Sequence, residues 1–184
     1  AVWIAQLWSD RLGKITDNCG SVVHIGLTTV KALGVTDQHS QVQLYTEGPF
    51  DKVITFIGVD KYRSEVTIPH SFDDIADVAF LSGHSFNELI KLEQKATEHA
   101  VTRSGHMNKT ITLPVVNPFT IGELLYFFEI QTAYAGELLN INAFDQPGVE
   151  EGKNATYALL GKHGYDEKRR ELDSAKPKKA GYIF

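Results

Sequence analysis

The sequence predicts an α/β fold, a three-layer sandwich in which a mostly parallel sheet is flanked by helices. Two runs, at residues 51–59 and 109–116, are β-branched and continuously apolar, which is typical of strands buried on both faces. A helical pattern follows each run along the chain. Because strands that alternate with helices form parallel sheets with helices on their faces, this order of elements indicates the sandwich.

The first part of the chain predicts a helix, a strand and a second helix. An apolar helical pattern covers residues 1–11 and ends before Gly13. Residues 21–27 form a possible strand. The next helix is expected to begin within "TDQHSQVQLY", with Thr36 or Asp37 as its cap, because either side chain can accept a hydrogen bond from a free backbone N–H.

The middle of the chain continues the alternation. Strand 51–59 is followed by a helix over about 85–102, and strand 109–116 by a helix that starts at Asn117-Pro118. The residues after this start are apolar around most of the helix circumference, so this helix is expected to be central. Ligands of parallel sheets bind beyond the carboxyl ends of the strands, near loops and helix starts.

A last predicted helix begins beside a turn that contains Asn142 and Asp145. Asp145 or Gln146 can cap this helix, and Pro147 suits its first turn because a proline lacks the N–H that would have no helical partner there. Gln146 and Lys153 are seven residues apart, which is two helical turns and therefore one face. This face looks either into a site or into water.

Composition indicates one soluble globular domain with a proper core. The chain has 184 residues, 42% of them hydrophobic and 22% charged, with a net charge of −5. This balance argues against nucleic-acid binding, and the basic cluster near the C-terminus is interleaved with acids. We expect a domain over residues 1–161, including its closing helices, and a charged, solvated tail over residues 162–184.

The single cysteine and the length of the apolar runs indicate the kind of cellular compartment to expect. A single cysteine, Cys19, excludes an internal disulfide framework and suits a reducing compartment. No run approaches about 20 apolar residues, so no membrane span is expected. The first residues have the pattern of the middle of a helix without a cap, which suggests that the chain is a fragment.

The run from Gly136 to Lys153 carries a recognisable motif. It reads Gly-x-Leu-Leu, four variable residues, then Phe-Asp-Gln-x-Gly-Val-Glu-x-x-Lys. At every fixed position it resembles the C-terminal motif of the glucose-6-phosphate isomerase (phosphoglucose isomerase) family. Residues 32–49 and 110–129 and the ending "GYIF" resemble the shorter bacterial members. The resemblance implies a Rossmann-like sugar isomerase (SIS) domain, the C-terminal one of two, with the N-terminal one absent from this chain.

The resemblance also implies an activity. Members interconvert glucose 6-phosphate and fructose 6-phosphate in glycolysis and gluconeogenesis, by ring opening and proton transfer through a cis-enediolate, with no metal or nucleotide cofactor. The expected ligand is therefore a hexose 6-phosphate, a carbohydrate derivative. The resemblance further implies a cytoplasmic homodimer with a shared active site, without nucleic-acid or membrane partners.

Four site residues follow from matching positions. By resemblance, Lys153 is the ring-opening partner near the sugar ring oxygen and Gln146 lies close to the phosphate, although spacing alone would favour an exposed helix lysine at 153. His39, which assists ring opening, reaches the site of the neighbouring subunit, and Gln38 beside it is assigned to substrate binding.

The catalytic base is where this sequence departs from the family. The family glutamate stands in a Glu-Ser-x-Gly-Lys context, and the aligned segment here is "DRLGK", which puts Asp10 at that position. Aspartate is one methylene shorter, and a displacement of about 1 Å can lower a rate roughly a hundredfold unless the backbone compensates. The alternative is that Asp10 only ends a helix, and that the base function is lost or is supplied by another carboxylate, such as Glu150.

Two other functions stay open. Asp10 favours a non-catalytic SIS module that binds phosphosugars, whereas His39, Gln146 and Lys153 together favour the enzyme. A dual phosphoglucose and phosphomannose isomerase is the other alternative, which the sequence does not decide. The remaining histidines show no metal-binding spacing, so no metal site is expected. They are His24, His70, His84, His99, His106 and His163.

Overall fold

A computed structural model describes residues 1–175, which form a mixed α/β fold. The chain divides into two compact units. The first unit contains Ala1–Leu7 and Thr28–Gln131, and the second contains Trp8–Leu27 and the chain from Thr132 onward. Residues 176–184, which include the ending "GYIF" and part of the predicted tail, lie outside the described residues.

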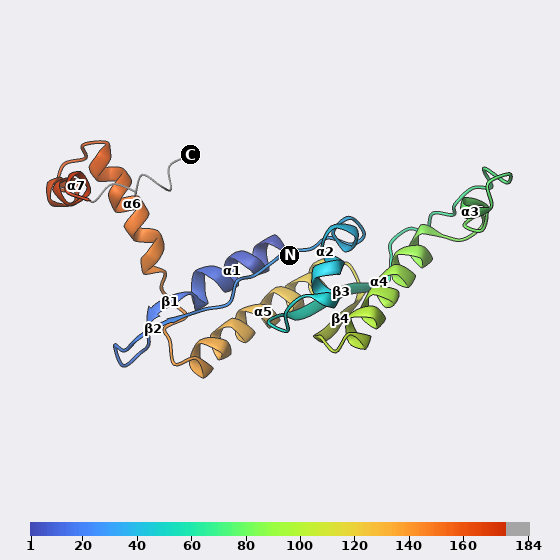
Figure 1. Ribbon diagram of the computed structural model, residues 1–184, viewed down its shortest axis with the longest axis horizontal. Helices are drawn as coiled ribbons and strands as arrows, with labels where there is room; N and C mark the ends of the chain where they lie inside the picture. Colours follow the sequence, from blue (N-terminus) through green and yellow to red (C-terminus); the bar gives the residue numbers. More distant parts are fainter. Residues whose placement is uncertain (176–184) are drawn as a thin grey trace. The chain divides into compact units, whose positions relative to one another are not determined.

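A parallel pair of strands is the centre of the first unit. Strand β3 (Val53–Lys61) pairs with β4 (Met107–Val115) from Val53↔Met107 to Lys61↔Val115. The connection between them contains α4 (Phe86–Arg103), which packs on both strands, and α2 (Thr36–Glu47) packs against α4 (Figure 1). The predicted α/β class, with a parallel sheet flanked by helices, is confirmed.

The expected burial of the two strands on both faces is wrong. Leu113 is the only buried residue of β4, and every residue of β3 is exposed or half-buried. The described sheet containing these strands has two members, so each strand has one free edge. Of the described helices, α4 contacts both strands. The apolar runs therefore predicted the strands correctly, but they did not predict how exposed the strands are in this chain.

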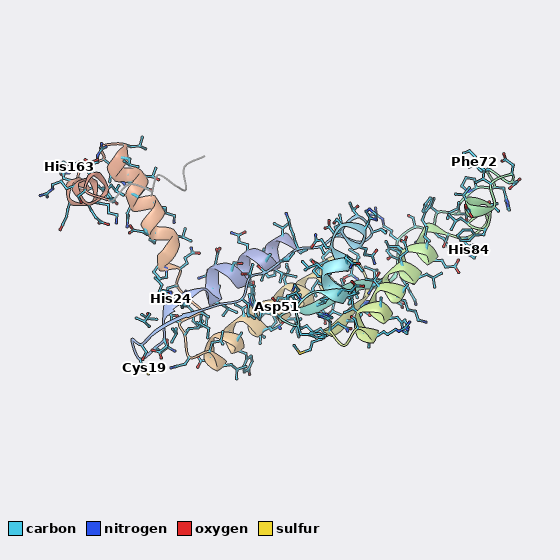
Figure 2. All side chains as sticks on the ribbon, viewed as in Figure 1. Cys19, His24, Asp51, Phe72, His84 and His163 are labelled. Carbon is cyan, nitrogen blue, oxygen red and sulfur yellow. The ribbon has the colours of Figure 1, made fainter. Side chains whose placement is uncertain are left out.

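The connection from β3 to α4 is long and includes the short helix α3 (Ala76–Ala79). Its ends are held together by a bridge between Thr67 and Ser85. Ser85 is also the N-cap of α4, because its hydroxyl accepts a hydrogen bond from the N–H of Glu88. The exposed Phe72 lies on this connection (Figure 2).

The core of the second unit joins the end of α1 (Val2–Leu12) to the segment after α5 (Pro118–Leu138). Leu12, Ile141 and Ala143 are buried against one another. The partly buried residues around them are Trp8, Ile25, Ala135 and Leu139. After α1 the chain forms an antiparallel ribbon of β1 (Lys14–Thr16) and β2 (Val22–Ile25), of which the sequence predicted only the second strand.

A missing side chain at Gly136 permits this core to close. A Cβ added there would lie 2.6 Å from the Cβ of Ala143, which is closer than non-bonded carbon atoms approach in proteins. At Gly122 on the same helix an added Cβ would meet no atom within 4 Å. The first fixed position of the Gly-x-Leu-Leu motif is therefore a packing requirement.

Replacing Gly136 by alanine should destabilise the full-length protein by about 1–3 kcal/mol, because the extra methyl overpacks a closed contact. Gly122→Ala is the matched control and should be neutral or stabilising by up to about 1 kcal/mol, since alanine favours a helix. Urea unfolding followed by circular dichroism measures both. Equal stability of the two variants would contradict the packing role of Gly136.

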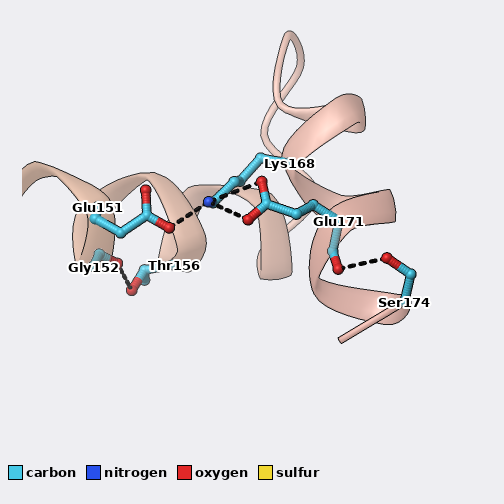
Figure 3. Close-up of polar contacts among 6 residues, drawn as sticks. All are labelled: Glu151, Gly152, Thr156, Lys168, Glu171 and Ser174. Carbon is cyan, nitrogen blue, oxygen red and sulfur yellow. Dashed lines mark hydrogen bonds and ion pairs between the residues drawn. The ribbon is translucent and has the colours of Figure 1, made fainter. Parts of the chain in front are cut away.

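The last two described helices are α6 (Pro147–Leu159) and α7 (Asp166–Asp173). They pack against each other, and Lys168 on α7 bridges Glu151 on α6 and Glu171 (Figure 3). Helix α7 lies inside the predicted tail and has an almost wholly polar sequence. The helix starts predicted near residues 36 and 147 are confirmed.

The expected caps of α2 are wrong. Its N-cap is Val35, which offers no side-chain bond, and Thr36 is already the first helical residue. The carboxylate of Asp37 instead accepts a hydrogen bond of 2.6 Å from the N–H of Leu33, before the helix. At α6 the predicted Gln146 does occupy the N-cap position, although its side chain makes no capping bond.

Candidate active site

Asp10 lies in the last turn of α1 and is half-buried. Two residues later Leu12 enters the core, and Gly13 ends the helix. A Cβ added at Gly26, the residue after β2, would lie 2.9 Å from the Cα of Gly13, so the chain that leaves the ribbon passes close to this helix end. The backbone beside Asp10 is therefore fixed by packing on two sides.

Lys14, the last residue of the "DRLGK" segment, is buried with 8% of its surface exposed. Its ammonium donates to the backbone carbonyl of Asp145 and lies 2.8 Å from Oδ1 of the same residue. This contact joins two motif segments that are 131 residues apart in the sequence. Sequence reasoning missed Lys14, although its fixed place in the family motif was an available signal.

Asp145 is held from two directions. Besides Lys14, the side-chain amide of Asn142 donates to its Oδ2 at 2.9 Å, and Oδ1 of Asn142 accepts from the N–H of Phe144. The hydrogen bond from Lys14 lowers the pKa of Asp145 below its ordinary value, so this carboxylate is charged at neutral pH. The turn before α6 is thus ordered by polar contacts up to the residue before Gln146.

Lys153 lies on α6, and Gln146 immediately precedes this helix. Gln146 is half-buried at the N-cap, and Lys153 is exposed two turns further along. The ammonium of Lys153 lies 2.7 Å from Oε1 of Glu150, and this hydrogen bond raises the pKa of the lysine above its ordinary value. Glu150, the alternative base, is therefore paired with the proposed ring-opening residue.

His39 and Gln38 lie in the first turn of α2, in the first unit. The ring of His39 is exposed. The side-chain amide of Gln38 donates to the hydroxyl of Thr97 at 2.7 Å and to the carbonyl of Glu93 at 3.3 Å, both on α4. Gln38 thus fastens α2 to α4, and its assignment to substrate binding stays a prediction.

The structure links the segments of three predicted site residues within the second unit. Leu12 and Lys14 tie the segment that carries Asp10 to the segment that leads into Gln146, from which α6 runs on to Lys153. His39 and Gln38 belong to the other unit.

Neither a metal centre nor a membrane span is found among residues 1–175, the part of the chain that the structure describes. No group of three His, Cys, Asp or Glu side chains there could hold a metal ion. No helix in the same range is long and apolar enough to cross a membrane. A hollow of about 300 Å³ lies beside α7 and contains none of the predicted site residues. It is lined by Gly164, Tyr165, Glu167, Lys168 and Glu171.

Comparison with known proteins gives a consistent result. A family profile described as phosphoglucose isomerase matches residues 1–178. A glucose-6-phosphate isomerase from Carboxydothermus hydrogenoformans is 58% identical over 172 residues, which cover 94% of this chain and 37% of the relative. One from Rubrobacter xylanophilus is 46% identical over 165 residues, covering 90% of this chain and 36% of the relative.

A solved structure agrees in fold as well as in sequence. The crystal structure of a hypothetical protein from Thermus thermophilus matches with a TM-score of 0.80 and 40% identity, over 87% of this chain and 38% of that one. This chain therefore spans little more than a third of the length of the relatives that it matches.

Proposed function

Because the chain belongs to the phosphoglucose isomerase family, we propose that it is the C-terminal SIS part of an enzyme that interconverts glucose 6-phosphate and fructose 6-phosphate. The observation that carries the proposal is the joining of the two motif segments. The "DRLGK" segment, with Asp10, and the Phe-Asp-Gln segment, with Gln146, are fastened by Lys14 and by the core around Leu12. The proposed base and the proposed phosphate contact therefore belong to two segments that pack against each other.

In the proposed reaction Asp10 is the base. Its carboxylate removes the proton from C2 of the open-chain aldose, next to the C1 carbonyl, which leaves a cis-enediolate. Returning the proton to C1, while the proton of the O2 hydroxyl moves to O1, gives the ketose with its carbonyl at C2. A half-buried carboxylate at a packed helix end suits this role, because the proton must be accepted and returned from one fixed position.

Ring opening needs a proton at the ring oxygen and the loss of one from the C1 hydroxyl. Lys153, which is charged at neutral pH, supplies an N–H donor for the ring oxygen. His39 exchanges the hydroxyl proton, contributed by the neighbouring subunit of a homodimer. Gln146 contacts the phosphate. Lys153 must leave Glu150 to act, which an exposed i,i+3 pair permits because such pairs are weak.

Exposed apolar side chains support the proposal that further chain covers this part. Phe119, Tyr126 and Leu138 on α5 are each more than 60% exposed. A helix that is apolar around most of its circumference is normally enclosed by protein. The N-terminal SIS domain and a second subunit are the proposed covers, and a cytoplasmic location follows from the proposed role in sugar metabolism.

Asp10 supports a second candidate, a phosphosugar-binding module without catalysis. The shorter side chain at the base position would weaken proton transfer and leave ligand contacts intact. A coupled assay on the full-length protein separates the two. Conversion of fructose 6-phosphate to glucose 6-phosphate supports the isomerase, whereas calorimetric binding of hexose 6-phosphate without turnover supports the module.

The 184-residue chain alone should have little or no isomerase activity. By family resemblance the phosphate is gripped mainly by Ser/Thr-rich loops of the N-terminal domain, and an arginine that stabilises the enediolate also lies there. The measurement is the coupled assay on the chain beside the full-length protein at equal molar concentration. Turnover of the chain close to that of the full-length enzyme would contradict the proposed division of the site.

A further inference from the structure

The proposed mechanism gives no role to Lys14, the most buried lysine among the described residues. Its side chain is only 5% exposed. Lysine is rarely buried, since removing an ammonium from water is unfavourable unless polar partners replace the water. The ammonium of Lys14 contacts one residue, Asp145, through both its backbone carbonyl and its carboxylate.

The position of this contact matters more than its strength. The carboxylate of Asp145 is 52% exposed, so solvent screens the pair and its contribution to stability is modest. Lys14 stands four residues after Asp10, and Asp145 stands immediately before Gln146. The ammonium therefore fastens the end of α1 to the start of α6, between the residues of the proposed site.

Among the described contacts between this turn and the end of α1, the one made by Lys14 lies nearest to α6. The core residues Ile141 and Ala143 pack on Leu12, and Asn142 orders the turn through Phe144 and the side chain of Asp145, which are contacts within the turn itself. Beyond the core, the carbonyl of Asp145 is held by Lys14. Without that donor, the contacts with the end of α1 that remain among residues 1–175 come from residues further back along the turn.

We propose that Lys14 is a positioning residue that holds the start of α6, and with it Gln146 and Lys153, at a fixed place relative to Asp10. This inference rests on the proposed isomerase function. The inference adds to that function that the geometry of α6 depends on a lysine that does not contact the substrate.

The test compares Lys14→Met with Lys52→Met in the full-length protein. Lys52 is a matched control, because it too donates to a carboxylate and to a carbonyl, those of Asp51 and Pro49, but in the first unit. We expect Lys14→Met to lower kcat roughly a hundredfold and to raise KM for the hexose 6-phosphate about tenfold, since a shift of about 1 Å has effects of this order. Lys52→Met should change neither.

Two further variants separate positioning from folding. Asp145→Asn keeps the backbone carbonyl and one side-chain oxygen as acceptors, so it should lose much less activity than Lys14→Met. Lys14→Arg keeps a charged donor and should recover at least part of the loss. Hydrogen exchange of residues 144–153, followed by mass spectrometry, should rise in Lys14→Met and stay unchanged in Lys52→Met.

The outcomes distinguish the inference from the function on which it rests. An inactive wild-type protein whose exchange still rises in Lys14→Met would refute the isomerase and retain the fastening of α6. An active wild type would overturn the inference if Lys14→Met kept kcat and KM within about twofold. In that case a lowered melting temperature would make Lys14 a stabilising residue only.

Discussion

Replacing Asp10 by asparagine in the full-length protein is expected to lower kcat by roughly a hundred- to ten-thousandfold, the usual contribution of a general base. Affinity for the sugar phosphate should hardly change, because the amide keeps the shape of the side chain but cannot accept the C2 proton. Asp10→Glu should keep or raise the rate, since it restores the longer reach of the family residue. Steady-state kinetics in both directions measure kcat and KM.

Asp173→Asn is the matched control for this prediction. Asp173 also stands in the last turn of a helix, α7, where it pairs with Arg169. If Asp10 only ends its helix, asparagine serves equally well and the two variants should behave alike. An unaffected Asp10→Asn variant would therefore remove Asp10 from the mechanism. Glu150 would then be the next carboxylate to test, although it would first have to release Lys153.

Elements with their own local pattern could be predicted from the sequence. Helix α4 has an amphipathic face and begins after a serine that caps it, and both features are visible in the letters. The three-residue strand β1 is too short to show a period. Helix α7 contains a single apolar residue, Leu172, and therefore has no apolar stripe. Strand β1 was therefore missed because of its length, and helix α7 because of its polar composition.

Burial and long-range contacts were the least predictable features. The apolar runs of β3 and β4 predicted strands, but exposure depends on what lies against them, and the sequence of one strand does not contain that information. The contact between Lys14 and Asp145 likewise has no local signal, since 131 residues separate the partners. In the sequence, Lys14 and Asp145 are connected only by standing in the two motif segments.

The site residues likewise have some features that the sequence predicted and others that became visible only in the structure. Spacing predicted Gln146 and Lys153 on one face of a helix, but α6 carries Lys153, whereas Gln146 is its N-cap and has a non-helical backbone. Resemblance, and not spacing, singled out Lys153 from other helix lysines such as Lys95, which is also exposed. The pairing of Lys153 with Glu150 became visible only in the structure, although an i,i+3 spacing of opposite charges permits it.

Lys153→Met in the full-length enzyme should lower the rate on the cyclic hexose 6-phosphate about a hundredfold and the rate on an open-chain analogue far less. The reason is that the proposed ammonium acts before proton transfer, on the ring oxygen alone. His39→Ala should show the same selectivity. Lys95→Met is the control for loss of an exposed helix lysine and should leave both rates unchanged.

The ion pair sharpens this prediction. Glu150 raises the pKa of Lys153 above its ordinary value near 10.5, so the ammonium persists at every pH of a practical assay. Deprotonation of Lys153 therefore cannot cause the activity to change with pH near neutrality. Glu150→Gln should leave Lys153 charged and easier to release, so the rate on the cyclic substrate should hold or rise. Equal losses on cyclic and open-chain substrates in Lys153→Met would instead assign this lysine to binding or proton transfer, and ring opening would need another donor.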